Sequence, residues 1–247
     1  MSYANSLKTS VSSPDNSFVL HFDEAGGLDY EAARFEAVSS MAAATQQLHF
    51  WQQARCLVVP RAYSQRRGIE AAVEDAADLG WPVFFRASGG SCVFHGENVL
   101  CITQLVCEPC GSTDLNDTYR RFTTDLLAAV SALGISAGHI GVAPNAPCDG
   151  RFNILVNGRK LAGTAMRRRT VSGMDTSLVH ACLWLRGPFT SALNAIEAFE
   201  TRLGIGNSYP PAACISLAEA TGRNNDASDL LAKDWACAMQ SLVHTTY

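Results

Sequence analysis

The sequence predicts an α/β fold of the α+β kind, in which a mixed β-sheet is packed with helices. Short apolar runs rich in β-branched residues, such as "ARCLVVP" at 54–60, indicate buried strands. Longer segments with apolar residues at helical spacing lie between these runs. The expected order is strand, helix, strand, strand, helix, hairpin, strand and helix. One domain is the simplest organisation that accommodates this order.

The first half of the chain is expected to hold three strands and two helices. The strands are expected at 54–60, 81–85 and 97–106. Apolar residues recur at helical spacing over 69–79, and Gly80 ends this first helix. The second helix begins near Asp114 and ends at Gly134.

The second half begins with a hairpin. "FNILVNGRKLAGTAM" (152–166) has two strand-like arms around Asn157-Gly158. This dipeptide is the strongest short hairpin signal because both turn residues tolerate a positive φ. "SLVHACLWL" (177–185) predicts a further strand, and helices are expected over 188–203 and around Trp235.

The composition is that of an ordinary soluble globular protein, with 47% hydrophobic and 17% charged residues among 247. The net charge of -4 argues against a nucleic-acid binder. No apolar run is long enough to cross a bilayer, so no membrane role is expected. Residues 1–17 are polar and Ser-rich and predict a disordered lead-in. Residues 18–247 then form the single domain, without an accessory C-terminal domain.

Nine scattered cysteines indicate a reducing, cytoplasmic setting, because a secreted disulfide framework would be small and even-numbered. "CEPC" (107–110) has the spacing of half a zinc knuckle. A structural zinc site needs four ligands, and the sequence contains no second Cys-x-x-Cys pair. Buried or incidental thiols are therefore the favoured interpretation of this motif.

"RASGGSCVFH" (86–95) places a glycine pair between two apolar runs. Gly89 and Gly90 carry no Cβ, so their amides can approach a phosphate or a carboxylate closely. Arg86 can add a planar, always-charged fork for phosphate oxygens. A glycine-rich turn without a ligand is the competing interpretation of this segment alone.

Lys160 lies two residues beyond the hairpin turn, on an expected strand. A lysine that faces inward is costly unless an anion accompanies it, whereas a solvent-facing lysine is the commoner case. Gly163, Thr164 and Ala165 would keep this side of the strand thin enough for a ligand. Together with the glycine loop, Lys160 would form a cationic clamp over a carboxylate and the α-phosphate of ATP.

These segments resemble those of the lipoate-protein ligase family, within the biotin and lipoate protein ligase superfamily. The resemblance covers about residues 51–185. It is carried by "FFRASGGSCVFHGEN" (84–98), "GRFNILVNGRKLAGTAMR" (150–167) and "VHACLWL" (179–185). It implies a fold similar to the catalytic domains of class II aminoacyl-tRNA synthetases and of biotin synthetase.

The resemblance also implies a reaction. ATP and lipoate, or a medium-chain acid, would give an acyl-AMP, and the acyl group would pass to a lysine of a lipoyl carrier domain. The carrier would belong to a 2-oxoacid dehydrogenase complex or be the glycine cleavage H-protein. Mg²⁺ is implied, but its ligands are not assignable.

By matched position, Lys160 would bridge the acyl carboxylate and the α-phosphate. Further residues would bind the substrate or its adenylate: Arg86, Ser88, Gly89, Gly90, Ser91, His95, Asn153, Gly163, Thr164 and Ala165. Family ligases that act alone often carry an extra C-terminal domain, so an accessory subunit is a further expected partner.

Two alternatives stay open beside the ATP-dependent ligase. The first is an ATP-independent octanoyl or lipoyl transferase that uses a cysteine thioester, for which Cys148 and Cys92 are the candidate nucleophiles. The second is a non-catalytic ligand-binding paralogue. It is motivated by Gly96 and Asn153, which stand where the family usually has acidic residues.

A basic run, "MRRRT" (166–170), follows the lysine hairpin. It is either a solvated strand end or a surface that attracts an acidic carrier domain.

Overall fold

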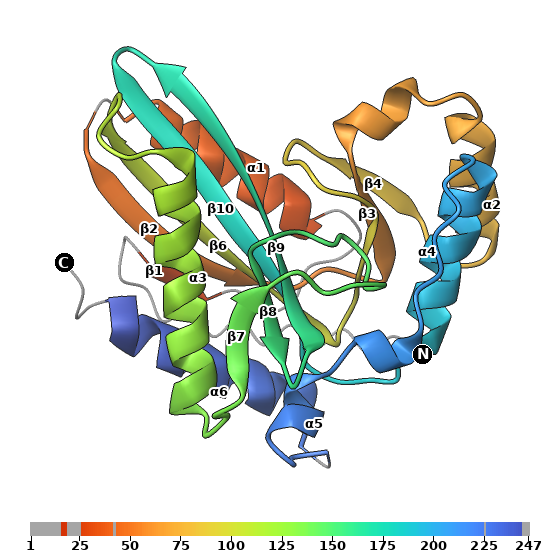
Figure 1. Ribbon diagram of the computed structural model, residues 1–247. Coiled ribbons are helices and arrows are strands. Elements are labelled where there is room, and N and C mark those ends of the chain that lie inside the picture. Colours follow the sequence, from red (N-terminus) through yellow and green to blue (C-terminus); the bar gives the residue numbers. More distant parts are fainter. Residues whose placement is uncertain (1–15, 19–25, 42, 225, 244–247) are drawn as a thin grey trace, which may run out of the picture.

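The computed structural model describes residues 16–18, 26–41, 43–224 and 226–243. The predicted disordered lead-in at 1–17 lies almost entirely outside these residues. Two sheets form the core of the fold (Figure 1). The larger has seven strands in the order β1-β2-β6-β10-β9-β8-β7, and the smaller has three in the order β4-β3-β5.

Both sheets are mixed, with parallel and antiparallel pairs. In the large sheet, β1 pairs parallel with β2 and the other neighbours pair antiparallel. In the small sheet, β3 pairs parallel with β4 and antiparallel with β5. The strands are β1 (Asn16–Phe18), β2 (Thr45–Trp51), β3 (Cys56–Pro60), β4 (Val83–Arg86), β5 (Val93–His95), β6 (Val99–Pro109), β7 (Gly138–Gly141), β8 (Asn153–Val156), β9 (Arg159–Val171) and β10 (Met174–Trp184). The predicted mixed sheet is thus confirmed.

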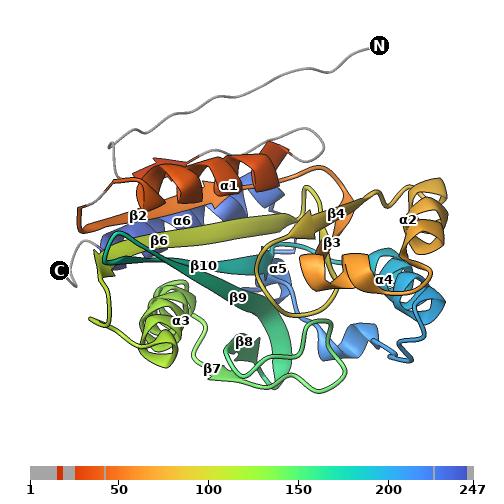
Figure 2. The same ribbon diagram turned by 90° about the horizontal axis from the view of Figure 1, so that it is seen from above.

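Helices cover both faces of the large sheet (Figure 2). The helices are α1 (Gly26–Ser39), α2 (Ile69–Asp78), α3 (Leu115–Ala132), α4 (Thr190–Arg202), α5 (Leu217–Ala220) and α6 (Ser228–Val243), with short 3₁₀ turns η1 (Arg61–Gln65) and η2 (Pro211–Ala213). On one face α1 packs against β6 and β10, whereas α3 and α6 build the core on the other face. Helices α2 and α4 pack beside the small sheet.

The alternation of side chains along β10 decides what reaches the α1 face. Val179 and Leu183 belong to the α3 and α6 core, whereas Leu178 packs with residues of α1. Since side chains alternate along a strand, His180 and Cys182 share the face of Leu178. The α1 face is therefore where polar and sulfur-bearing side chains collect.

The hairpin and helices α2, α3 and α4 were predicted close to their observed bounds, but several elements were not predicted, among them α1 and β2. The inward side of α1 carries the buried Glu31, and β2 holds Gln46 and Gln47 near its start, of which Gln47 is buried. Buried polar residues conceal the apolar periodicity on which such a prediction depends. Within the described residues, no helix combines the length and apolarity needed to span a membrane.

Asp114 caps α3: its side chain accepts a hydrogen bond of 2.8 Å from the amide of Asp117. Replacing it in Asp114→Ala leaves that amide without its partner, so we expect a loss of about 1 kcal/mol in the free energy of unfolding. Urea denaturation measures this loss. Asp114→Asn, which keeps the accepting oxygen, should match the wild type; equal destabilisation by both variants would contradict the capping role.

Candidate functional site

Seven of the predicted site residues, among them Arg86, Cys148 and Lys160, line a small cavity between the two sheets. Its free volume is about 30 Å³. Its walls combine α1, both sheets and the loop before β8: Leu28, Trp51, Val58, Arg86, Val93, His95, Cys148, Lys160, Gly163, Thr164, Ala165, His180, Cys182 and Trp184. A larger hollow of about 500 Å³ lies beside His95, lined by Arg55, Trp81 and Arg186 among others. His95 is the one predicted site residue among the described residues that line it.

Lys160 points inward and is 1% exposed. Its Nζ donates hydrogen bonds to the carbonyl oxygens of Pro147 (2.5 Å) and Cys148 (2.8 Å). It also lies 5.8 Å from the centre of the Trp184 ring. Burial lowers the pKa of this amine below its ordinary value of 10.5. The amine is thus held at the cavity wall, directly beside the Cys148 backbone.

Cys148 lies against the glycine loop. The amide of Ser91 donates to its Sγ over 3.3 Å. A Cβ on Gly90 would stand 2.5 Å from that sulfur, so only glycine allows this close approach. Cys148 itself has a φ of 53°, in the left-handed region that non-glycine residues rarely adopt. Such backbone strain concentrates at functional sites.

Arg86 supports the loop from inside. Its guanidinium donates to the carbonyl oxygens of Val58 (2.8 Å), Gly89 (2.8 Å) and Ser91 (2.8 Å). These bonds fix the curvature of the loop, and Gly90 supplies the required φ of 102°. Arg86 thus lines the cavity, yet its donors are directed at backbone oxygens in this structure.

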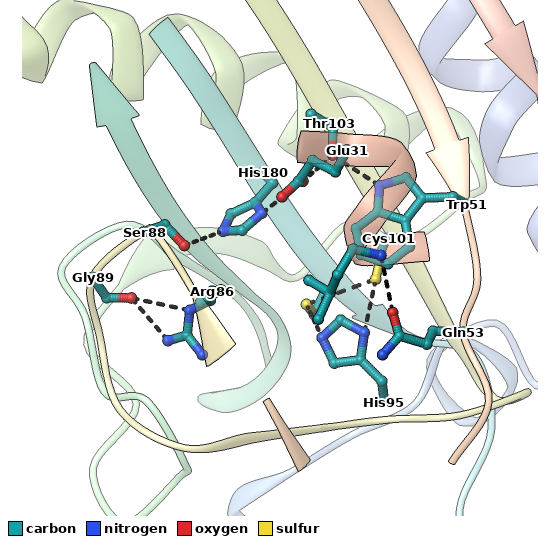
Figure 3. A network of polar contacts seen from close by, with 12 residues as sticks. Glu31, Trp51, Gln53, Arg86, Ser88, Gly89, His95, Cys101, Thr103 and His180 are labelled. Carbon is teal, nitrogen blue, oxygen red and sulfur yellow. Dashed lines mark hydrogen bonds and ion pairs between the residues drawn. The ribbon is translucent and has the colours of Figure 1, made fainter. Parts of the chain in front are cut away.

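A chain of hydrogen bonds joins the loop to α1 (Figure 3). Ser88 Oγ lies 2.9 Å from His180 Nε2, and His180 Nδ1 lies 2.9 Å from a carboxylate oxygen of Glu31. Thr103 donates to the same oxygen over 2.5 Å and accepts from the indole of Trp51 over 3.0 Å. These five side chains are buried.

Glu31 and His180 form a buried ion pair. Burial alone would raise the pKa of Glu31, but the charge of His180 and hydrogen bonds from His180 and Thr103 lower it below 4.5. Burial alone would lower the pKa of His180, but the Glu31 carboxylate raises it above 6.5. A protonated His180 donates to Glu31 through Nδ1 and to Ser88 through Nε2. The Ser88 hydroxyl proton is then free to bond a ligand.

The imidazole of His95 lies between two cysteines. Its Nδ1 is 3.3 Å from Cys101 Sγ, and its Nε2 is 3.4 Å from Cys182 Sγ. The ring of Trp51 lies 5.7 Å away, centre to centre. Hydrogen bonding from Cys101, then the charge of His95, lowers the pKa of Cys182 well below 9.0, whereas burial raises that of Cys101.

The other predicted residues support the walls. Gly163 lies against Lys160, Thr164 donates to the Phe152 carbonyl over 2.8 Å, and Ala165 is buried. Asn153 is buried and donates to the Gly150 carbonyl, but its Oδ1 has no hydrogen-bond partner among the described residues. Cys92, the second candidate nucleophile, is fully buried and burial raises its pKa well above 9.0, which argues against a nucleophilic role.

The three arginines of the basic run all bind within the chain. Arg167 stacks 3.7 Å from the centre of the Phe35 ring, and Arg168 donates to the Thr113 carbonyl over 2.7 Å. Arg169 pairs with Glu36 over 2.8 Å. The run thus ties β9 to α1 and to the start of α3, a role that neither interpretation of the sequence included.

The resemblance to the ligase family implies a Mg²⁺ ion near this cavity. Mg²⁺ prefers anionic oxygen ligands, and the described residues that line the cavity include no aspartate or glutamate. The nearby Asp149 carboxylate accepts a hydrogen bond from the Ala143 amide. The residues at this cavity therefore do not fit an Mg²⁺ ion.

The fold is a mixed α/β domain whose two sheets enclose a buried lysine beside a glycine loop. The sequence profile of the lipoyl protein ligase A/B catalytic domain matches residues 26–230. The chain belongs to this family.

Relatives and solved structures agree with the assignment. An uncharacterized protein of Cupriavidus necator is 32% identical over 209 residues, which are 78% of this chain and 81% of that protein. An octanoyl-GcvH:protein N-octanoyltransferase of Kyrpidia tusciae is 31% identical over 175 residues, 66% of this chain and 59% of that protein. The crystal structure of lipoate-protein ligase A bound with ATP superposes with a TM-score of 0.63 at 14% identity, covering 92% and 85% of the two chains. That likeness shows the fold.

Glu31, Thr103, Cys101 and Cys182 were not predicted as site residues. The sequence holds no short-range signal for them, since Glu31 and His180 are 149 residues apart. The inward position of Glu31 follows only once α1 is placed on the face that carries His180.

Gly163→Ala should displace the Lys160 amine. A Cβ at this position would stand 2.9 Å from both Cε and Nζ of Lys160. These are the ends of a flexible side chain, so the amine moves while the fold stays stable. We expect acyl transfer to fall by at least about tenfold with the melting temperature nearly unchanged. Gly206→Ala, which adds a Cβ with no heavy atom within 4 Å, is the matched control; equal activity of both variants would contradict the placement of Lys160.

The Glu31–His180 pair should make stability depend on pH. The raised pKa of His180 gives a stabilisation that is complete below 6.5 and lost as pH rises through the raised value. The lowered pKa of Glu31 gives one that is complete above 4.5 and lost as pH falls through the lowered value. Both stabilising contributions are therefore complete between pH 4.5 and pH 6.5.

Thermal melts of wild type and Glu31→Gln test this window. The difference in melting temperature should be larger at about pH 5.5 than at about pH 8.5. Glu36→Gln removes an exposed carboxylate of the same helix and serves as control. A difference that is equal at both pH values would argue against a charged pair.

Proposed function

We propose that this protein transfers an octanoyl or lipoyl group to a lysine of a lipoyl carrier domain through a thioester on Cys148, without ATP. The observation that carries the proposal is the position of Cys148. Its sulfur accepts a hydrogen bond from the Ser91 amide at the wall of the cavity. The buried amine of Lys160 is bonded to the carbonyl of the same residue. A thiol beside a backbone donor and a cation is the arrangement that nucleophilic acyl transfer requires.

In the first step, the Cys148 thiolate attacks the carbonyl carbon of an acyl donor. The carbonyl oxygen takes the negative charge, and the bond to the donor's leaving nitrogen or sulfur breaks as that atom takes a proton. In the second step, the amine of the carrier lysine attacks the thioester carbonyl and gives up a proton. An amide forms, and the Cys148 thiolate leaves.

The glycine loop has the donors for both steps. Backbone amides and the Ser88 hydroxyl, whose oxygen accepts from His180, are fixed before the substrate arrives. Fixed donors stabilise the developing oxyanion without reorganisation. Lys160 keeps the Cys148 backbone in place and adds a positive charge near the reacting carbonyl. The Arg86 bonds hold the loop in this shape.

The acyl chain would enter between the apolar walls of the cavity, which Trp51, Val58 and Trp184 supply. The free volume of about 30 Å³ is far below the roughly 300 Å³ of ordinary ligand pockets. Acyl binding thus requires the walls to move apart, and the loop that carries Cys148 is a wall that belongs to neither a sheet nor a helix.

A lipoyl carrier domain is the proposed partner. Family membership supports it, as does the transferase of Kyrpidia tusciae, whose name specifies GcvH as the acyl source and a protein as the acceptor. An accessory subunit and a cytoplasmic location remain proposals that accompany this function.

The second candidate is the ATP-dependent ligase that forms an acyl-AMP from lipoate. The ATP-bound ligase of the same fold and the inward Lys160 favour it. Two observations count against it: the cavity walls do not fit Mg²⁺, and the Arg86 donors are directed at the loop carbonyls.

Cys148→Ser separates the candidates. With an octanoylated H-protein and an acceptor lipoyl domain, and without ATP, the wild type should modify the acceptor, and the variant should lose at least about a thousandfold in rate because the thiolate is absent. Mass spectrometry should show an octanoyl adduct on the wild-type enzyme at Cys148. Cys92→Ser, which changes a fully buried thiol that is not among the residues lining the cavity, should keep activity.

A ligase would behave differently in the same assay. It would require ATP and lipoate, exchange pyrophosphate into ATP, and tolerate Cys148→Ser; this result would overturn the transferase proposal. Ligand binding with neither activity would indicate the non-catalytic paralogue. Lys160→Ala should abolish modification in either reaction, so it tests the site and not the mechanism.

A further inference from the structure

A sulfur and nitrogen cluster lies at the end of the cavity away from the glycine loop. Cys101 on β6 and Cys182 on β10 are directly opposite each other in the antiparallel register, with their sulfurs 4.0 Å apart. His95, at the end of β5, places Nδ1 3.3 Å from one sulfur and Nε2 3.4 Å from the other. The small sheet thereby brings a histidine onto a thiol pair of the large sheet (Figure 3).

The spacing suits a single ion. For a tetrahedral ion with metal–sulfur bonds of 2.3 Å, two sulfur ligands lie roughly 3.8 Å apart, and a sulfur and a nitrogen roughly 3.6 Å apart. The measured sulfur–sulfur distance is 4.0 Å, and one ligand atom from each of the three residues lies within 4.8 Å of the others. Only small shifts, with one nitrogen of His95 turned to the ion, close the set.

We propose that His95, Cys101 and Cys182 bind one thiophilic d¹⁰ cation, with Zn²⁺ as the representative ion. Two thiolates and one imidazole are soft ligands that select zinc over magnesium or calcium. His95 and Cys182 line the cavity, so the fourth coordination position faces it. The cavity volume of about 30 Å³ leaves room for a water molecule, the ligand that completes a three-residue zinc site.

The burial of the cluster favours a bound cation. His95 and Cys101 are buried, at 4% and 1% exposure, and Trp51 covers the imidazole ring. Two thiolates there would be unstable alone, and a divalent ion would neutralise them. The "CEPC" motif lacks these features, because Cys110 is exposed and Cys107 contacts Thr176. Among the described residues, the His95 cluster is the one group of at least three such ligands.

Zinc titration of the full-length, reduced protein tests the site. With a chromophoric chelator as competitor, the wild type should bind one equivalent of Zn²⁺, and Cys101→Ser and Cys182→Ser should each lose at least about tenfold in affinity. Cys107→Ser and Cys110→Ser are matched controls that should bind as the wild type does. Loss of binding in the controls, with binding kept in the first pair, would assign the ion to the "CEPC" motif and overturn the proposal.

Two measurements on the wild-type protein test the site without any variant, so they do not depend on whether a variant folds. Co²⁺ in place of zinc should give sulfur-to-metal charge-transfer absorption, which requires thiolate ligands. Zn²⁺ should also protect Cys182 from alkylation, as measured on its tryptic peptide, at unchanged alkylation of the exposed Cys110. Absent cobalt absorption, absent protection, or a Cys101–Cys182 disulfide that persists under reductant would each refute the site. All these readings are independent of acyl transfer.

Discussion

The buried Glu31–His180 ion pair is the interaction on which the site depends. It joins α1 to β10, and through Ser88 it joins both to the glycine loop. A buried pair stabilises a fold only when its remaining donors and acceptors are satisfied. Thr103 and Ser88 meet that condition, so the pair fixes where the loop begins. The Ser91 amide that meets Cys148 is three residues further along, and its position follows from this anchor together with the Arg86 bonds.

The sequence predicted the parts of the site that are encoded locally. The Asn157-Gly158 turn has positive φ at both residues, as a two-residue hairpin requires, and Lys160 follows on β9. The glycine loop was likewise recognised from its composition. Its Gly90 needs a positive φ and leaves space for the Cys148 sulfur, a requirement that any side chain would violate.

The remainder depends on contacts between distant segments. Glu31 resembles a surface residue of a polar helix until α1 is placed over β10, and Cys101 meets Cys182 only through strand register. The role of Arg86 illustrates a different limit. Its charge suggested a phosphate ligand, but three carbonyl oxygens of its own neighbourhood use the donors. Composition alone does not show to which acceptors a guanidinium group donates its hydrogen bonds in the folded chain.

Lys160 and Cys148, the two groups of the proposed reaction, are held in different ways. The Lys160 backbone is fixed on both sides: it pairs with Leu155 of β8 beside a β-bulge, and its carbonyl accepts from the Ile215 amide over 2.9 Å. Cys148 lies in a loop whose strained φ is maintained by the Ser91 amide and the Lys160 amine. The amine is thus the fixed point of the cavity. In the proposed reaction, the sheet that holds the Lys160 backbone would stay in place while the Cys148 loop adjusts to the acyl chain.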